Sequence, residues 1–195
     1  MTCCVNVADG GGGKKKDPVY EFINGQHLPE YCDIPYGNST LGYSGCEVIA
    51  LFNMLILRSE GEALDSIISF MVDRYNKYPD LLSGWGMYGK FGAAPQDIAV
   101  FLSTRGIDYQ FSYSQKKLNK NRDAGVYIVS FWNSSGPVLP VFSGYHTVAI
   151  SYDGTNYMAY NYDCDFSDTT PSKGGIDYYL NGKGGYFFGF FIPNS

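Results

Sequence analysis

Cys46 is the residue of this sequence that is best placed for covalent chemistry. It follows Ser44 and Gly45 and opens the apolar run CEVIALFNMLILR, which predicts a helix. A thiol in a first helical turn lies next to unpaired backbone N–H groups, which favour a thiolate and can hold an oxyanion. The alternative role is that of a small buried apolar side chain, the usual one for a lone cysteine. Cys46 is therefore a candidate nucleophile.

His146 is the candidate base. The sequence has two histidines, and His27 lies in a turn-rich region where we expect a surface role. His146 comes directly before the alternating apolar run of residues 147–152, which predicts a β-strand. Such a strand would fix the backbone and leave the imidazole facing a cleft, although a structural histidine would show the same pattern.

A predicted hairpin brings a third polar group to this histidine. Residues 153–156 (DGTN) are a turn signal that joins the strand after His146 to a second strand over 157–162. The second strand returns Asn161 to the neighbourhood of the imidazole, where its side chain could accept the ring N–H and fix the tautomer. Asp163, two residues on and on the same predicted strand face, is the alternative orienter.

The surrounding pattern predicts helices first and strands later. The run Cys46–Arg58 is apolar around nearly its whole circumference, as in a core helix. Ala63–Tyr75 and the segment from Pro95 to Gly106 predict two further helices. Strands are predicted at Val19–Ile23, Tyr109–Tyr113, Tyr127–Phe131, His146–Tyr152, Tyr157–Tyr162 and Gly185–Ile192. This order indicates an α+β fold in which a buried N-terminal helix packs against a C-terminal antiparallel sheet.

Length and composition fit one globular domain with a short tail. The chain has 195 residues, of which 45% are hydrophobic, enough for a sizeable core. Residues 1–17, with the run GGGGKKK, predict a disordered tail, and residues 18–195 the folded domain. The formal net charge of −5 argues against nucleic-acid binding, and the lack of a long apolar run argues against a membrane span.

The cysteines and the first residues bear on cofactors and compartment. Five cysteines without a CxxC pair predict no metal site and no disulfide framework, and no cofactor is indicated. The first residues lack the apolar core of a secretory signal, so the sequence as written predicts a cytoplasmic protein. A cysteine before a Gly/Lys-rich tether is also typical of a mature lipoprotein. A membrane-tethered or secreted form is therefore the alternative, if the true start lies upstream.

Several strings resemble one enzyme family. GCEVIALFNMLIL is similar to the nucleophile helix of bacterial peptidases of the bacteriocin-processing, double-glycine-peptidase-like group, within the papain-like superfamily. The step Ile34-Pro35-Tyr36 resembles the group's approach to that helix, residues 89–106 its middle helix, and GYHTVAISYDGTNYMAYN its histidine hairpin. The resemblance covers most of residues 31–165. It implies a papain-like cysteine peptidase with Cys46, His146 and Asn161 as catalytic residues and a peptide or protein as substrate.

Two positions depart from the pattern of the group. Asn38 stands where the group has an oxyanion-hole Gln, and its amide is one methylene shorter. Asn161 stands where the group more often has an Asp followed by Pro, and papain-like enzymes also use Asn. Both departures also suit a catalytically degenerate, peptide-binding relative. An acyltransferase that uses the same thiol is a further alternative.

A substrate groove is expected beside the nucleophile. Gly45 and Gly144 would let a substrate backbone approach closely, and Tyr43 is a further candidate for the lining of this groove. Trp85 belongs to the Gly-rich stretch Ser83–Ala94, a predicted loop whose aromatic residues suit peptide contact. The same aromatic residues could instead anchor the loop to the core.

Overall fold

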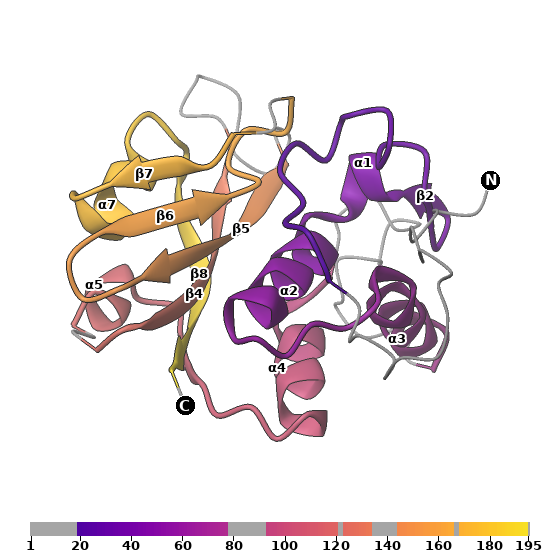
Figure 1. The fold of residues 1–195 in the computed structure, drawn as a ribbon, viewed down its shortest axis with the longest axis horizontal. Helices are drawn as coiled ribbons and strands as arrows, with labels where there is room; N and C mark the ends of the chain where they lie inside the picture. The colour runs from indigo at the N-terminus through magenta and orange to yellow at the C-terminus, as the bar shows by residue number, and fades with distance from the viewer. Residues whose placement is uncertain (1–18, 78–92, 121–122, 134–143, 166–167, 195) are drawn as a thin grey trace, which may run out of the picture.

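The computed structural model describes residues 19–77, 93–120, 123–133, 144–165 and 168–194. In these residues the chain forms a mixed α+β structure (Figure 1), so the predicted class is confirmed. The elements are β1 (Pro35–Tyr36), β2 (Ser39–Thr40), α1 (Leu41–Ser44), α2 (Cys46–Leu57), α3 (Leu64–Lys77), α4 (Pro95–Thr104), β3 (Gln110–Ser112), α5 (Gln115–Leu118), β4 (Gly125–Trp132), β5 (Tyr145–Tyr152), β6 (Tyr157–Tyr160), β7 (Thr170–Ser172), α7 (Gly175–Leu180) and β8 (Gly185–Pro193).

One antiparallel sheet of six strands forms the C-terminal part, in the order β3-β8-β4-β5-β6-β7. The central strand β4 pairs with β5 on one side and with β8 on the other, and His146 of β5 lies opposite Phe131 of β4. The predicted hairpin is confirmed: the Asp153 N–H donates to the Asn156 carbonyl at 3.2 Å and closes the turn between β5 and β6.

Helix α2 is the core helix that the sequence predicts. Its residues from Cys46 to Leu55 are all buried, because apolar side chains surround it and both α3 and β5 pack against it. In Figure 1, α2 lies between the sheet on one side and helices α1 and α3 on the other. The predicted helices over 63–75 and from Pro95 onward correspond to α3 and α4.

Two hydrophobic clusters cover the two faces of the sheet. The larger cluster joins α2, α3 and α4 to one face, and Ala149 of β5 belongs to it. The smaller cluster contains Ile176 and Tyr179 of α7 on the other face, with Val148 and Ile150 of β5. Since successive side chains of a strand point to opposite faces, Thr147 shares the α2 face with Ala149, and His146 starts on the other face.

The predicted strand Val19–Ile23 is wrong. The backbone N–H of Ile23 donates to Asn53 Oδ1 at 2.9 Å, and Asn53 Nδ2 donates to the Ile23 carbonyl at 2.8 Å. A buried side-chain amide of α2 thus satisfies the backbone groups that a neighbouring strand would otherwise pair. This segment therefore runs extended along α2 without joining a sheet.

Strand β6 is shorter than predicted, and the short elements β1, β2, α1, α5, β7 and α7 were not anticipated. β6 ends at Tyr160, so Asn161 and Asp163 lie in the turn that follows it and not on a strand face. The short elements α5, β7 and α7 have at most six residues each, too few for a periodic pattern. The predicted tail over residues 1–17 and most of the loop Ser83–Ala94 fall outside the described residues. No helix in the described ranges is long and apolar enough to cross a membrane.

Candidate active site

Cys46 lies at the start of α2, as predicted, but its surroundings do not favour a thiolate. The side chain is buried, and burial raises the pKa of its thiol well above the usual range. The neighbouring Glu47 raises the pKa further, whereas the backbone N–H of Thr147 donates toward the sulfur and lowers it. The stabilisation expected from the helix end is therefore outweighed, and the resting group is a neutral thiol.

The glycines beside the site are explained by the fold. A Cβ on Gly45 would lie 2.4 Å from Leu41 Cδ1 and 2.6 Å from the Leu41 carbonyl oxygen, so the fold itself requires a glycine at this position. Gly144 enters β5 with φ of +72°, a conformation that favours glycine. Tyr43, two residues before Gly45, is 67% exposed. Trp85 lies outside the described residues.

The imidazole of His146 is buried, and its tautomer follows from one hydrogen bond. Its Nε2 lies 2.6 Å from the backbone carbonyl oxygen of Asn161. A carbonyl oxygen only accepts, so Nε2 carries the proton and Nδ1 keeps its lone pair. Burial lowers the pKa of His146 to about 4, so the ring is neutral near pH 7. Nδ1 is thus the nitrogen that can act as a base.

Asn161 fixes the imidazole through its backbone and not, as predicted, through its side chain. Its φ of +57° is left-handed, which Asn tolerates better than most residues. The side chain instead holds the N-terminal segment: Oδ1 accepts the N–H groups of Gly25 and Gln26 at 3.1 and 2.9 Å, and Nδ2 donates to Gln26 Oε1 at 2.9 Å. The N–H of Asn161 donates to Asn24 Oδ1 at 2.9 Å. One residue therefore joins segment 24–26 to the base.

Asp163 is exposed and does not hydrogen-bond to the imidazole among the residues that the structure describes. Its Oδ1 accepts the backbone N–H of Asp165 at 3.1 Å. Its charge raises the pKa of His146 only as a minor cause beside burial. Asp163 thus contributes to the field around the base without orienting it.

A second thiol contacts the base. Cys164 Sγ lies 3.9 Å from Nδ1 and 3.8 Å from Nε2 of His146. Nearly equal distances to both nitrogens place the sulfur away from the in-plane direction of the Nδ1 lone pair, so Cys164 covers the ring more than it pairs with it. Burial raises the pKa of Cys164 to about 12. The His27 N–H donates to the Cys164 carbonyl at 2.8 Å, and the His27 ring pairs with Asp165 at the surface.

Cys46 and His146 are neighbours without a direct hydrogen bond. The contact between the sulfur and the N–H of Thr147 brings Cys46 to the residue that follows the base. Within the described ranges, no hydrogen bond joins Cys46 Sγ to the imidazole, whose partners are Asn161 and Cys164. Catalytic hydrogen bonds are often long in a structure without substrate and tighten when substrate binds.

The two amides that precede Cys46 occupy different surroundings. Asn38 is exposed in the turn between β1 and β2. Gln26, which the sequence argument missed, is buried, and its Nε2 donates to the Gly42 carbonyl at 2.8 Å. The pair Asn24 and Gln26 between apolar Ile23 and Leu28 was the available sequence signal, because two amides in a short apolar segment require partners.

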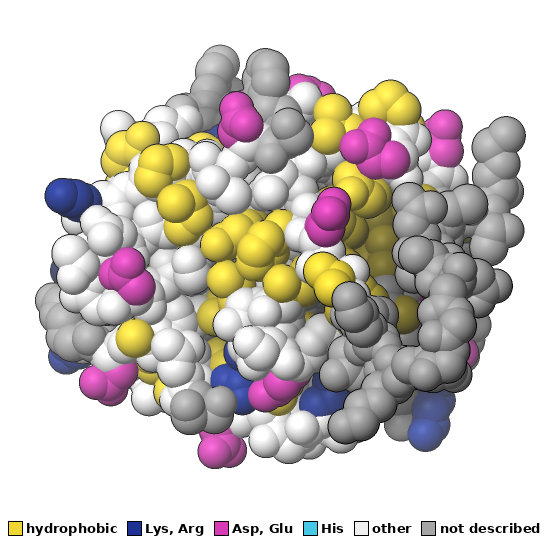
Figure 2. All heavy atoms as spheres, viewed as in Figure 1, with side chains coloured by type: hydrophobic (Ala, Val, Ile, Leu, Met, Phe, Trp, Pro, Cys, Tyr) yellow, Lys and Arg dark blue, Asp and Glu magenta, His cyan; other side chains and the backbone are white. Residues whose placement is uncertain are grey.

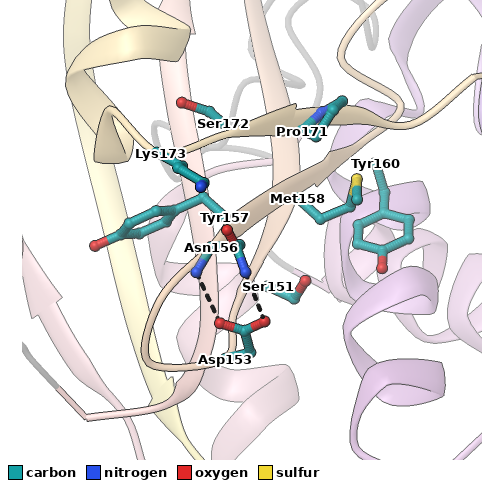
Figure 3. A pocket seen from close by; sticks show the side chains of 9 residues that line it. All are labelled: Ser151, Asp153, Asn156, Tyr157, Met158, Tyr160, Pro171, Ser172 and Lys173. Carbon is teal, nitrogen blue, oxygen red and sulfur yellow. Dashed lines mark hydrogen bonds between the residues drawn. The ribbon is translucent and has the colours of Figure 1, made fainter.

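A hollow of about 600 Å³ lies at the other end of the β5–β6 hairpin. Ser151, Met158 and Tyr160 line it together with Pro171 of β7 (Figure 3). His146 stands at the opposite end of β5, so this hollow is separate from the thiols. In Figure 2, apolar side chains extend across the face that carries β6, and the ring of Phe22 lies 4.4 Å from that of Tyr160.

A scan of the chain against protein-family models finds no match, and a search of curated proteins finds none either. The geometry of the site is therefore the basis for a functional argument. In the described part of the chain, no three His, Cys, Asp or Glu side chains come together in a way that could hold a metal ion.

Proposed function

We propose that this protein is a papain-like, cysteine-dependent peptidase or amidase that forms an acyl-enzyme on Cys46. The observation that carries the proposal is the hydrogen bond from His146 Nε2 to the Asn161 carbonyl, because it leaves Nδ1 free to act as a base. The backbone N–H of the next residue, Thr147, contacts the Cys46 sulfur. The resemblance of the strings around Cys46 and His146 to the bacteriocin-processing peptidase group supports the same reading. The substrate would be a peptide or a protein.

The chemistry would start from a neutral pair. As Cys46 Sγ attacks an amide carbonyl, His146 Nδ1 takes the thiol proton, and the carbonyl oxygen becomes an oxyanion. The protonated imidazole then donates this proton to the leaving amine, the C–N bond breaks, and a thioester remains on Cys46. Water attacks the thioester with His146 again as the base, and the acid and the free thiol are released.

Two kinds of donor are available for the oxyanion. The backbone N–H of Cys46 belongs to the first turn of α2, where it has no partner within the helix. A side-chain amide would supply the second donor. Asn38 has the position that the family resemblance implies, whereas Gln26 is buried and already bonded to Gly42 of the segment that leads to Cys46. We therefore propose Gln26 as an alternative second donor.

The test uses a tryptic digest of casein as a mixture of unfolded peptides. Incubation with the full chain is expected to produce new peptide termini, which mass spectrometry detects, and Cys46→Ala is expected to abolish them. Cys32→Ala is the matched control, since Cys32 is a half-buried free thiol remote from His146 in the sequence. Addition of glycine amide separates hydrolysis from acyl transfer, because an acyl-enzyme that prefers amines will form new amides.

A peptide-binding module without turnover is the second candidate. It is favoured by the lack of a hydrogen bond between Cys46 and His146 among the described residues and by the raised pKa of the thiol. In that case the same casein peptides would be retained by immobilised protein, wild type and Cys46→Ala alike, and no new termini would form.

A further inference from the structure

Glu47 is a fully buried carboxyl group directly after the candidate nucleophile. Its exposed fraction is 0%, although glutamate almost never lies in a protein interior without a partner of opposite charge. Among the described residues, Glu47 forms no ion pair, and its Oε2 atom is buried without a hydrogen-bond partner. The proposed mechanism does not use this group, so its position requires another explanation.

The contacts of Glu47 fall on both sides of His146. Thr147 Oγ1 donates to Glu47 Oε1 at 3.5 Å, and the same hydroxyl lies 2.6 Å from Ser130 Oγ of the neighbouring strand. Because each hydroxyl has one proton, the order of donation is Ser130 to Thr147 to Glu47. Tyr145, on the other side of His146, interacts with the Glu47 carboxyl, and its hydroxyl donates to the Ala93 carbonyl at 3.1 Å.

Strand alternation explains why this arrangement acts on the base. Tyr145 and Thr147 share the face of β5 that meets α2, and His146, between them, starts on the other face. A carboxyl of α2 that accepts from Thr147 and lies near Tyr145 therefore helps to set the register between the start of the helix and the histidine.

The groups that face Glu47 are acidic or neutral. They are the thiol of Cys46 on α2, the phenol of Tyr145 on β5 and the phenol of Tyr36 on β1. Asp97 of α4, which also acts on Tyr36, is paired with Arg74 at 3.1 Å. Burial raises the pKa of Glu47 to about 7, so the carboxyl changes charge near neutral pH. Once ionised, it opposes a second negative charge on the adjacent sulfur.

We infer that Glu47 is a positioning residue: it ties helix α2 to strand β5 through Thr147, the residue after His146, and its negative charge restrains ionisation of Cys46. The inference rests on the proposed role of Cys46 as a nucleophile. It deepens that role by assigning a pH response to the site. As the pH rises through neutrality, the reaction rate of Cys46 therefore increases less per pH unit than the rate of an isolated thiol would.

The experiment measures the rate at which iodoacetamide alkylates Cys46 in the full chain between pH 6 and pH 9, read by peptide mapping. A single thiol below its pKa reacts about tenfold faster for each pH unit. In wild type, the alkylation rate of Cys46 is expected to increase less than tenfold per pH unit near pH 7, where Glu47 ionises. Glu47→Gln keeps the shape of the side chain without the charge, and it is expected to follow the full tenfold slope and to react about three- to tenfold faster at pH 8.

Glu62→Gln is the matched control, because Glu62 is a half-buried carboxylate held by Arg105 and not by β5. Its profile is expected to superimpose on that of wild type. The inference is overturned if Glu47→Gln and wild type share one slope, or if Glu62→Gln changes the slope as much as Glu47→Gln does.

Thr147→Val provides a second route if Glu47→Gln does not fold. It removes the donor to Oε1, which makes the carboxylate harder to form, so the change of slope should move to higher pH. An unmoved profile would contradict the inference. Alkylation needs no turnover, so absence of casein cleavage together with the Glu47 effect would count against the peptidase proposal alone.

Discussion

The two sides of His146 are built in different ways. On one side, Cys46 belongs to α2, a 12-residue helix held by apolar packing on every face. On the other side, Asn161 and Cys164 lie in a turn after β6 whose amide and backbone groups are hydrogen-bonded to residues 24–27. The first side depends on hydrophobic burial, and the second on individual hydrogen bonds.

This difference separates reactivity from orientation. The helix side supplies the thiol of Cys46. Burial and the neighbouring Glu47 raise the pKa of this thiol and keep it protonated. The turn side contributes no nucleophile in the proposal, yet the Asn161 carbonyl determines which nitrogen of His146 is basic. Substitutions on the helix side should abolish peptide cleavage, whereas substitutions on the turn side should mainly lower the free energy of unfolding.

The largest effect is expected on the helix side. Cys46→Ala should reduce peptide cleavage by at least about 10³-fold, because the acyl-enzyme is proposed to form on this thiol. Its stability should change little, since a thiol and a methyl group are both small and apolar. Counting new termini in the casein digest gives the rate, and urea denaturation gives the stability. Residual cleavage within about tenfold of wild type would move the nucleophile elsewhere, with Cys164 as the first residue to examine.

A pH dependence of stability links the two sides. Between pH 4 and pH 6.5 the unfolded chain binds a proton at His146 that the folded protein does not, so the free energy of unfolding rises with pH by about 3 kcal/mol. Between pH 4.5 and pH 7 the folded protein keeps a proton on Glu47 that the unfolded chain lacks, so the free energy falls by a similar amount. The two contributions nearly cancel in wild type.

Variants that remove one group should expose the other. In Glu47→Gln the free energy of unfolding should increase with pH across the range from 4.5 to 6.5, and in His146→Gln it should decrease. Urea denaturation at several pH values in this range measures both slopes. Equal slopes in wild type and in both variants would show that neither group changes its proton binding on folding.

Asn161→Ala tests the turn side directly. It leaves the N–H groups of Gly25 and Gln26 without their acceptor and puts alanine at φ of +57°. We expect a loss of about 3 kcal/mol in the free energy of unfolding. Asn161→Gly removes the same bonds without the backbone strain, so it should lose about 1 kcal/mol less. If both variants unfold like wild type, the polar contacts do not hold this side.

The smallest effect belongs to the surface ion pair that closes the turn. The His27 ring and the Asp165 carboxylate are both largely in solvent. Asp165→Ala should therefore change the free energy of unfolding by less than about 1 kcal/mol. The matched change Asp168→Ala, in an acidic residue just beyond this turn, gives the baseline. A loss as large as that of Asn161→Ala would mean that the ion pair, and not the amide network, holds Cys164 over the imidazole.

Much of the fold could be predicted because hydrophobic periodicity marks it. The long apolar run of α2 and the alternating strands β4, β5 and β8 each carry enough residues for their period to be read. The strand predicted at Val19–Ile23 failed because its partner is the side chain of Asn53, and a tertiary hydrogen bond leaves no periodic trace. The short elements α5, β7 and α7 carry too few residues for any period.

The places of the candidate residues in the fold could be predicted from the sequence, but their hydrogen bonds could not. Cys46 lies at the start of a helix and His146 near the start of a strand, as expected, and Asn161 follows the hairpin. The backbone of Asn161 is left-handed, and its carbonyl, instead of the side chain that was expected, accepts from the imidazole. The spacing of residues in a sequence does not reveal such a backbone angle. Gln26 was missed because its partner Asn161 lies 135 positions away. Cys164 was missed because no regular strand or helix pattern places a residue of the turn after β6.

The contact between segment 24–26 and Asn161 also bears on how the protein assembles. The hydrogen bond from the Gly25 N–H to Asn161 Oδ1 joins residues 136 positions apart. Contacts of such separation close large loops and form late in folding. The thiol of Cys46 is present early in synthesis, but His146 is held in the tautomer with a free Nδ1 only after Asn161 has been made and has folded against it. A nascent or partly folded chain would therefore carry the thiol without its proton acceptor, and its chemistry would begin only when folding is finished.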